Sequence, residues 1–210
     1  MKAFTKEAQA RISPMGAIEL LKQGNQRFVE NQKADRDLLE QVKDTATGQY
    51  PFATVLSCID SRVSAELVFD QGVGDIFSVR VAGNVVNEDL LGSMEFACKL
   101  AGTKVIVVLG HTSCGAVKGA CDDAHLGNLT TLLSKIKPAV QAVNQPEDPA
   151  ERTSKNLHFV DQVARVNVRM TIANIRKNSP VLRIMEEDGE IAIVGAMYDI
   201  RTGEVAFMDS

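Results

Sequence analysis

The sequence predicts an α/β fold in which a central, mostly parallel β-sheet is flanked by helices. Short β-branched, apolar runs at residues 52–57, 75–81 and 104–109 are typical of strands. The first and third runs are almost continuously apolar, as in strands that are covered on both faces. A helix-length segment at residues 90–100 separates the second run from the third, and a strand, a helix and a strand in this order imply that the two strands pair in parallel.

Helices are expected on both sides of these strands in the sequence. Residues 14–22 and 25–29 carry apolar side chains at helical spacing, with few β-branched residues. They indicate an N-terminal helical arm over about residues 1–48, lying on the outside of the body. Two later helices are expected around residues 129–136 and from about residue 156 to residue 177.

The C-terminal end predicts a β-hairpin. Residues 191–198 and 204–208 indicate two strands, and residues 201–203, with the sequence Arg-Thr-Gly, supply the turn between them. The chain contains no internal repeat, low-complexity segment or linker that would mark a boundary, so residues 1–210 are expected to form a single domain.

The composition is that of an ordinary soluble protein, and it narrows the class of partner. Of the 210 residues, 45% are hydrophobic and 24% are charged, and the net charge is −4. The chain has no Trp, only 2 Tyr and no run of Lys or Arg, which argues against nucleic-acid binding and favours a small substrate. The apolar runs are too short to span a membrane and the N-terminus has no apolar signal core, so a cytoplasmic location is expected.

Residues 58–62 and 111–114 supply two thiolates and one imidazole, from Cys58, His111 and Cys114. Three protein ligands with one position left open are typical of a catalytic zinc site, whereas a structural site is closed by four. Cys58 ends one predicted strand and His111 ends another, and the carboxyl ends of parallel strands are where open α/β sheets bind ligands. The sequence therefore predicts a catalytic metal centre at that edge.

The residues around these ligands carry three further expectations. Cys114 is expected at the start of a helix, where the backbone amides favour a thiolate, and Gly110 is expected to allow a tight turn before the histidine. If the chain stays extended after Cys58, the side chains of Asp60 and Arg62 point to the same side as its sulfur. An ordinary surface ion pair is the alternative interpretation of Asp60 and Arg62.

The remaining cysteines and histidines are expected to have no part in the metal centre. Four cysteines in a chain of this length do not make a disulfide framework, and Cys98 and Cys121 are expected to be buried thiols. His125 and His158 have no second ligand at useful spacing and are expected on the surface.

Together these segments resemble the bacterial β-carbonic anhydrases over most of the chain. The motifs that carry the resemblance are residues 24–28 (GNQRF), 49–52 (QYPF), 58–63 (CIDSRV), 80–84 (RVAGN) and 110–117 (GHTSCGAV). The resemblance implies the β-carbonic anhydrase fold and the reversible hydration of carbon dioxide to bicarbonate and a proton. It also implies one Zn²⁺ per chain, bound by Cys58, His111 and Cys114.

The same resemblance assigns roles to five other residues. Asp60 orients the zinc-bound water, and Arg62 holds Asp60 away from the metal. Gln49 donates a hydrogen bond to the substrate, and Phe77 and Ala82 line an apolar pocket for carbon dioxide. Members of the family build this site at a dimer interface, with the glutamine and the aromatic residue from the partner subunit, and often pair dimers into tetramers. A homodimer or homotetramer is therefore implied.

The active-site pattern is closer to the plant type than to the subgroup that bicarbonate regulates, with one departure from each. Plant-type members have a tyrosine where this chain has Phe96, so the role of that hydroxyl does not carry over. The regulated subgroup has a tryptophan three residues before the first cysteine, where this chain has Val55. Arg80 matches the arginine of the regulatory pocket, but it is more simply a structural hydrogen-bond or ion-pair partner.

Two other functions are compatible with the same residues. A related hydrolase of carbonyl sulfide or carbon disulfide would use the same fold and metal ligands. A non-catalytic zinc-binding protein would also keep the ligands, but it would not need Asp60 and Arg62, whose presence argues against it.

Overall fold

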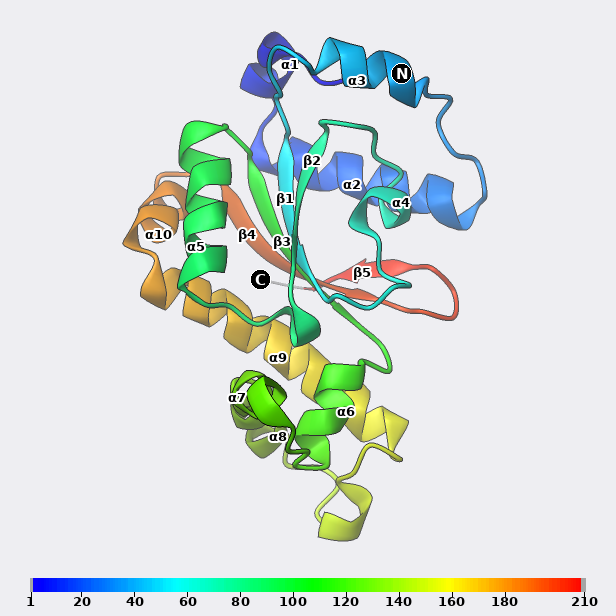
Figure 1. The fold of residues 1–210 in the computed structure, drawn as a ribbon, viewed down its shortest axis with the longest axis vertical. Helices are drawn as coiled ribbons and strands as arrows, with labels where there is room; N and C mark the ends of the chain where they lie inside the picture. The colour runs from blue at the N-terminus through cyan, green and yellow to red at the C-terminus, as the bar shows by residue number, and fades with distance from the viewer. Residues whose placement is uncertain (1, 209–210) are drawn as a thin grey trace.

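The computed structural model describes residues 2–208 and has a five-stranded sheet at its centre (Figure 1). The strand order is β2-β1-β3-β4-β5; the first four strands are parallel and β5 is antiparallel to β4. The strands are β1 (Ala53–Ser57), β2 (Ile76–Arg80), β3 (Val105–His111), β4 (Ala192–Tyr198) and β5 (Val205–Phe207). The predicted α/β fold, mostly parallel sheet and C-terminal hairpin are confirmed.

Ten α-helices and three shorter helical turns occupy the described residues. The α-helices are α1 (Lys6–Arg11), α2 (Pro14–Val29), α3 (Leu38–Asp44), α4 (Ala65–Val68), α5 (Glu88–Glu95), α6 (Gly115–Cys121), α7 (Gly127–Ser134), α8 (Lys137–Ala142), α9 (Leu157–Asn178) and α10 (Pro180–Glu187). The short turns are η1 (Ala82–Asn84), η2 (Phe96–Leu100) and η3 (Pro149–Glu151). None of the helices in residues 2–208 combines the length and the apolar character needed to cross a bilayer.

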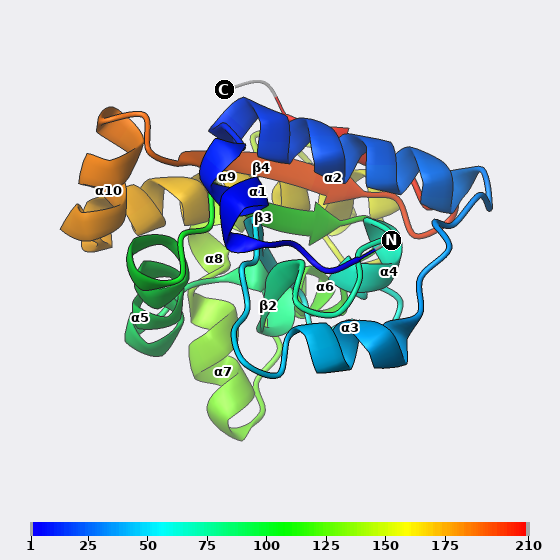
Figure 2. The same cartoon turned by 90° about the horizontal axis from the view of Figure 1, so that it is seen from above.

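The two central strands, β1 and β3, are buried on both faces, as their apolar runs predict. Successive side chains of a strand point to opposite faces. Leu56 and Ile106 belong to the core cluster that includes buried side chains of α9, whereas Val55 and Val107 belong to the cluster that includes Leu21 of α2. Figure 2 shows α2 lying along one face of the sheet.

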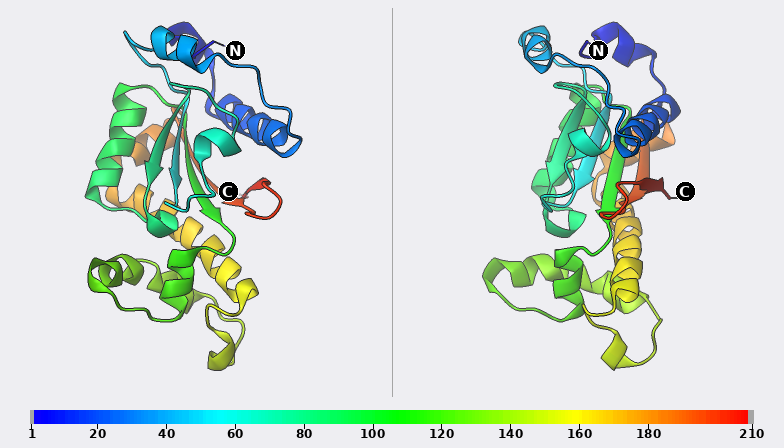
Figure 3. Two further views of the ribbon diagram at one scale, coloured as in Figure 1. Left: turned by 45° about the vertical axis from the view of Figure 1, so that its right-hand side comes forward. Right: turned by 90° about the vertical axis from the view of Figure 1, so that its right-hand side faces the viewer.

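Besides the helices that flank the sheet, two groups of helices lie beyond its opposite ends (Figure 3). The N-terminal arm carries α1 and α3 beyond the amino ends of the strands. The helices α6, α7 and α8 group with the N-terminal half of α9 beyond the carboxyl ends. Because the strands are parallel, the residues that follow β1 and β3 lie at the end of the sheet that faces this second group.

Three details differ from the sequence predictions. Residues 14–29 form one continuous helix instead of two, with Ser13 accepting a hydrogen bond from the Gly16 amide at its start. The α-helical part of the crossover, α5, ends at Glu95, and the chain continues as the wider helical turn η2 over Phe96–Leu100. The strands β2 and β3 do not pair with each other, because β1 lies between them and pairs with both.

Candidate metal centre

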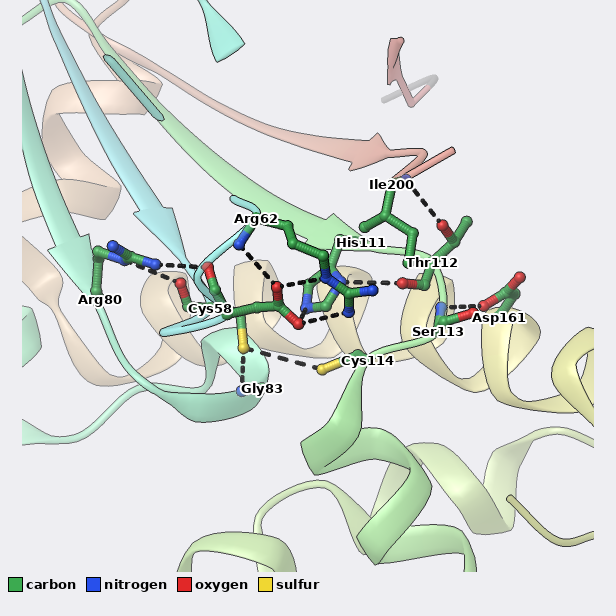
Figure 4. A network of polar contacts seen from close by, with 11 residues as sticks. Cys58, Arg62, Arg80, Gly83, His111, Thr112, Ser113, Cys114, Asp161 and Ile200 are labelled. Atoms are coloured by element: carbon green, nitrogen blue, oxygen red, sulfur yellow. Dashed lines mark hydrogen bonds and ion pairs between the residues drawn. The ribbon is translucent and has the colours of Figure 1, made fainter. Parts of the chain in front are cut away.

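The three predicted ligands meet at the carboxyl edge of the sheet (Figure 4). Ser57, the last residue of β1, pairs with Leu109 of β3, so Cys58 and His111 leave neighbouring strands at nearly the same level. Cys114 is the N-cap residue of α6, as predicted from the sequence. All three side chains are buried.

The ligand atoms are close enough to bind one ion. They all lie within 4.8 Å of one another, and the Sγ atoms of Cys58 and Cys114 are 4.0 Å apart. A tetrahedral Zn²⁺ with Zn–S bonds of about 2.3 Å separates two sulfurs by about 3.8 Å. No other group of this kind is found among residues 2–208.

The imidazole of His111 is also arranged for a metal. Its Nδ1 lies 3.0 Å from the carbonyl oxygen of Thr112 and can donate to it, which fixes the tautomer and leaves the lone pair on Nε2. Nε2 is buried and has no hydrogen-bond partner. A buried nitrogen without a partner is costly unless a ligand satisfies it. The site therefore fits zinc.

The two thiols are strongly coupled. The pKa of Cys58 is lowered to about 4, chiefly because the Cys114 thiol donates a hydrogen bond to its sulfur, with His111 and the Gly83 amide contributing. The pKa of Cys114 is raised, first by that same hydrogen bond and then by burial. A bound cation would favour the deprotonated form of both groups, because cysteine binds metals as the thiolate.

Asp60 and Arg62 form a two-pronged ion pair beside these ligands. Arg62 Nε lies 2.9 Å from Asp60 Oδ1, and Nη2 lies 2.8 Å from Oδ2. These hydrogen bonds hold the pKa of Asp60 well below its usual range. Asp60 Oδ2 is 4.0 Å from His111 Nε2, so the carboxylate borders the metal site instead of lying on an unrelated surface.

The chain reaches this arrangement by a turn, which the extended geometry did not predict. The Val63 amide donates to the Asp60 carbonyl oxygen at 3.0 Å, and the Arg62 amide donates to Asp60 Oδ1 at 3.0 Å. The turn folds the guanidinium back onto the carboxylate. The sequence prediction assumed an extended chain, in which alternating side chains share one side with Cys58. That assumption was wrong, because residues 60–63 form a turn.

Arg80 secures the backbone of the same loop. Its Nε donates to the carbonyl oxygen of Cys58 at 3.0 Å, and its Nη2 donates to that of Asp60 at 2.7 Å. Arg80 is thus a hydrogen-bond partner of the ligand loop, as its simpler interpretation predicted.

The loop that carries the other two ligands is held by residues that sequence reasoning missed. Asp161 of α9 accepts a hydrogen bond from the Ser113 amide at 2.8 Å, and the Thr112 hydroxyl accepts one from the Ile200 amide at 3.1 Å. Ser113 has a φ of +55°, a strained conformation that these contacts stabilise. No local sequence signal marks Asp161, because it is 48 residues from its partner.

Gly110 has a different role from the predicted one. It lies inside β3 and has no left-handed φ. A Cβ there would lie 2.6 Å from Val168 Cγ2 and 2.7 Å from Met197 Sδ, so close packing of α9 and β4 excludes a side chain.

The three predicted substrate-binding residues are not together in one chain. Ala82 opens η1 and is next to Gly83, whose amide donates to Cys58 Sγ at 3.4 Å. Gln49 is exposed in the loop between α3 and β1, and Phe77 lies on the edge strand β2, with its ring 6.3 Å from that of Phe96. Only Ala82 adjoins the metal ligands of its own chain.

The other cysteines and histidines are placed largely as predicted. Cys98 is buried and contacts the Thr103 hydroxyl, whereas Cys121 is only partly buried. Burial raises the pKa of both thiols to about 11. His125 and His158 are exposed.

Fold and site together fit the class of α/β metalloenzymes, with a group of three side chains that could hold a zinc ion. The sequence profile of the carbonic anhydrase family matches residues 53–205. Carbonic anhydrase 2 of Mycobacterium tuberculosis is 34% identical over 94% of both chains, and the carbonic anhydrase of Mycolicibacterium smegmatis is 35% identical over 92% of both. The chain belongs to the carbonic anhydrase family, whose zinc enzymes hydrate carbon dioxide reversibly.

Solved structures place the fold in the β class. The β-carbonic anhydrase CcaA superposes with a TM-score of 0.71 at 27% identity, covering 91% of this chain and 95% of that one. The β-carbonic anhydrase CafA of Aspergillus fumigatus superposes with a TM-score of 0.68 at 25% identity, covering 93% and 90%.

Proposed function

We propose that Cys58, His111 and Cys114 hold the catalytic Zn²⁺ of this carbonic anhydrase and that Asp60 and Arg62 act beside it. The observation that carries the assignment is the Asp60 carboxylate, held by two guanidinium hydrogen bonds at 4.0 Å from the free Nε2 of a ligand histidine. A storage site would gain nothing from this carboxylate.

Each side chain has a defined task. When bound, zinc supplies a Lewis acid that makes a water molecule acidic enough to react near neutral pH. Asp60, kept ionised, accepts a hydrogen bond from that water and orients it. Arg62 keeps Asp60 out of the open coordination position. Ala82, beside Gly83, forms part of the apolar wall for carbon dioxide.

Stopped-flow measurement of carbon dioxide hydration, with and without a zinc chelator, tests this function. Rapid hydration that the chelator abolishes is expected. The same assay with carbonyl sulfide and carbon disulfide distinguishes the rival hydrolase, because that enzyme would turn over these substrates faster than carbon dioxide. An inactive, zinc-loaded protein would instead favour the non-catalytic alternative.

Gln49 and Phe77 point to a dimer, since neither can serve its own site. Gln49 precedes β1 and Cys58 follows it, so an extended strand of five residues, about 16 Å, separates them. Phe77 is the second residue of β2, far from that strand's carboxyl end. We infer that these residues complete the site of a partner subunit, where Gln49 donates a hydrogen bond to a substrate oxygen.

Two surfaces support such an assembly. Within residues 2–208, no strand pairs with the outer side of the edge strand β2, and Leu38, Leu39 and Val42 expose an apolar face on α3. A solved fold neighbour from Sordaria macrospora is described as tetrameric. A homodimer is therefore proposed, with a tetramer of two dimers as the further assembly.

The Leu39→Asp variant is expected to dissociate into monomers and to lose most of its activity, because a charge would have to be buried in the subunit interface. Light scattering after gel filtration and the hydration assay measure the two effects. Leu126→Asp is the matched control, since Leu126 is about as exposed, at 71% against 75%, but lies at the start of α7. A fully active, monomeric Leu39→Asp protein would contradict the shared site.

Bicarbonate is expected to inhibit the enzyme without cooperativity. Val55 is buried within β1 and offers no indole donor, and Arg80 is engaged with the backbone of the ligand loop. Cooperative inhibition would need a second bicarbonate site whose occupancy favours an inactive state. The hydrogen-bond donors that would form such a site are therefore missing or already engaged. Titration of initial rates with bicarbonate at mildly acidic to alkaline pH measures this, and a sigmoidal inhibition curve would refute it.

A single domain and a cytoplasmic location are also proposed. The core clusters on the two faces share one sheet, which supports residues 1–210 acting as a single domain with an arm over about residues 1–48. All four cysteines are free, which supports a reducing, cytoplasmic compartment.

A further inference from the structure

Gly83 connects the metal centre to the long helix α9. Its backbone amide donates to Cys58 Sγ at 3.4 Å, and its carbonyl oxygen accepts a hydrogen bond from Asn167 Nδ2 at 2.8 Å. Asn167 lies in the middle of α9 and is 2% exposed. Because both backbone groups of one residue are engaged, the side chain of Asn167 can act on Cys58 through Gly83.

The conformation of Gly83 leaves little freedom on its other side. Its φ is +70°, which favours glycine. A Cβ would lie 2.5 Å from Ile136 Cδ1 and 3.3 Å from Ala116 Cβ. Ile136 is fully buried. The peptide is therefore confined between this packing and the amide of Asn167.

Asn167 is an unfavourable choice for a helix interior unless this contact needs it. Asparagine has low helix propensity, and a buried amide is costly without a hydrogen bond. The neighbouring buried residues Val163, Ala164 and Val168 are apolar and belong to the core cluster, and Thr171 is the next buried polar residue, one turn later. The hydrogen bond to Gly83 offsets the free-energy cost of burying the Asn167 amide.

We propose that Asn167 is a positioning residue for the metal centre: by fixing the Gly83 carbonyl it holds the Gly83 amide on Cys58 Sγ. A hydrogen bond to a ligand sulfur withdraws electron density from the thiolate and limits its donation to a bound metal. Outer contacts of this kind tune metal affinity and electronic properties. Asn167 touches neither the ligands nor the substrate.

The test uses the cobalt-substituted protein, whose thiolate-to-metal charge-transfer band reports the electron donation directly. The Asn167→Leu variant is expected to shift this band to longer wavelength, because Cys58 loses a hydrogen bond and donates more strongly. In the zinc protein, competition with a chromophoric chelator is expected to show a dissociation constant about tenfold higher, the lower end for such outer-contact changes. Affinity falls although Cys58 donates more strongly, because Gly83 no longer holds the Cys58 sulfur in the position for binding.

Asn25→Leu is the matched control. Asn25 is a buried residue of α2 whose Nδ2 donates to the carbonyl oxygens of Gly203 at 2.8 Å and Val68 at 3.0 Å, and whose Oδ1 accepts from the Val205 amide. The variant therefore loses the same kind of contact, and more of them, away from the metal centre. It is expected to lose stability while the band and the zinc affinity stay unchanged. Asn167→Ala, which removes the donor without adding bulk or charge, is expected to shift the band like Asn167→Leu and covers a failure of that variant to fold.

The inference rests on the proposed role of Cys58 as a metal ligand, and the two failures are distinguishable. If that role were wrong, Cys58→Ser cobalt protein would keep the full thiolate band of the parent. If only the role of Asn167 were wrong, the parent band would depend on Cys58 but would stay unmoved in both Asn167 variants. A shift of equal size in Asn25→Leu would also overturn the proposal.

Discussion

The Cys114→Ser protein is expected to lose its zinc and its carbon dioxide hydration together. Cys114 is buried at the start of α6, 4.0 Å from the sulfur of Cys58, and a site with one thiolate and one imidazole no longer holds zinc firmly. Activity should fall by more than about 100-fold, because losing a ligand exceeds the usual effect of an outer contact. Cys58→Ser and His111→Ala should behave alike.

Metal analysis of the purified proteins, together with the stopped-flow assay, measures both losses. The controls are Cys98→Ser and Cys121→Ser, which remove thiols outside the cluster and should retain zinc. A Cys114→Ser protein with nearly one zinc per chain and most of its activity would show that the ligand assignment is wrong.

The Asp60→Asn protein is expected to keep its zinc while its turnover falls by about 100-fold, as when an oriented polar group is removed from an active site. The amide preserves the shape of the side chain, but it has no charge and only one acceptor oxygen, so it cannot hold both Arg62 contacts and orient the water as the carboxylate does. Arg62→Ala should be at least as harmful, because Asp60, whose Oδ2 already lies 4.0 Å from His111 Nε2, is then free to enter the open coordination position. Zinc content and turnover are measured on the same samples.

Unfolding does not explain such losses, since Arg62 is 52% exposed and an exposed ion pair contributes little to stability. Asp199 and Arg201 provide the matched control, because they form the same pair two residues apart, with the Arg201 amide on Asp199 Oδ1 at 2.8 Å. Arg201→Ala should therefore retain its turnover. Full activity in Arg62→Ala would contradict the gating role.

The strands of the central sheet and the ligands that follow them could be predicted from the sequence. The runs of β1 and β3 are apolar throughout because both faces are covered, and that pattern is local. Cys58, His111 and Cys114 could be placed at one edge because parallel strands align their carboxyl ends. That Cys98 is a buried thiol outside the metal centre could also be predicted, because it follows no predicted strand and has no second cysteine or histidine close to it in the sequence.

Other features depend on contacts between distant residues, and only the tertiary structure decided them. The position of β2 beside β1 and the close packing around Gly110 leave no local pattern. The turn that brings Arg62 onto Asp60 is itself local, but its backbone is held by Arg80 from β2. The supports from α9 are of the same kind, since Asp161 is 48 residues from Ser113 and Asn167 is 84 from Gly83. Periodicity and spacing report what a residue does within its own element. Which side chains of a helix meet a given loop is set by the packing of the whole core.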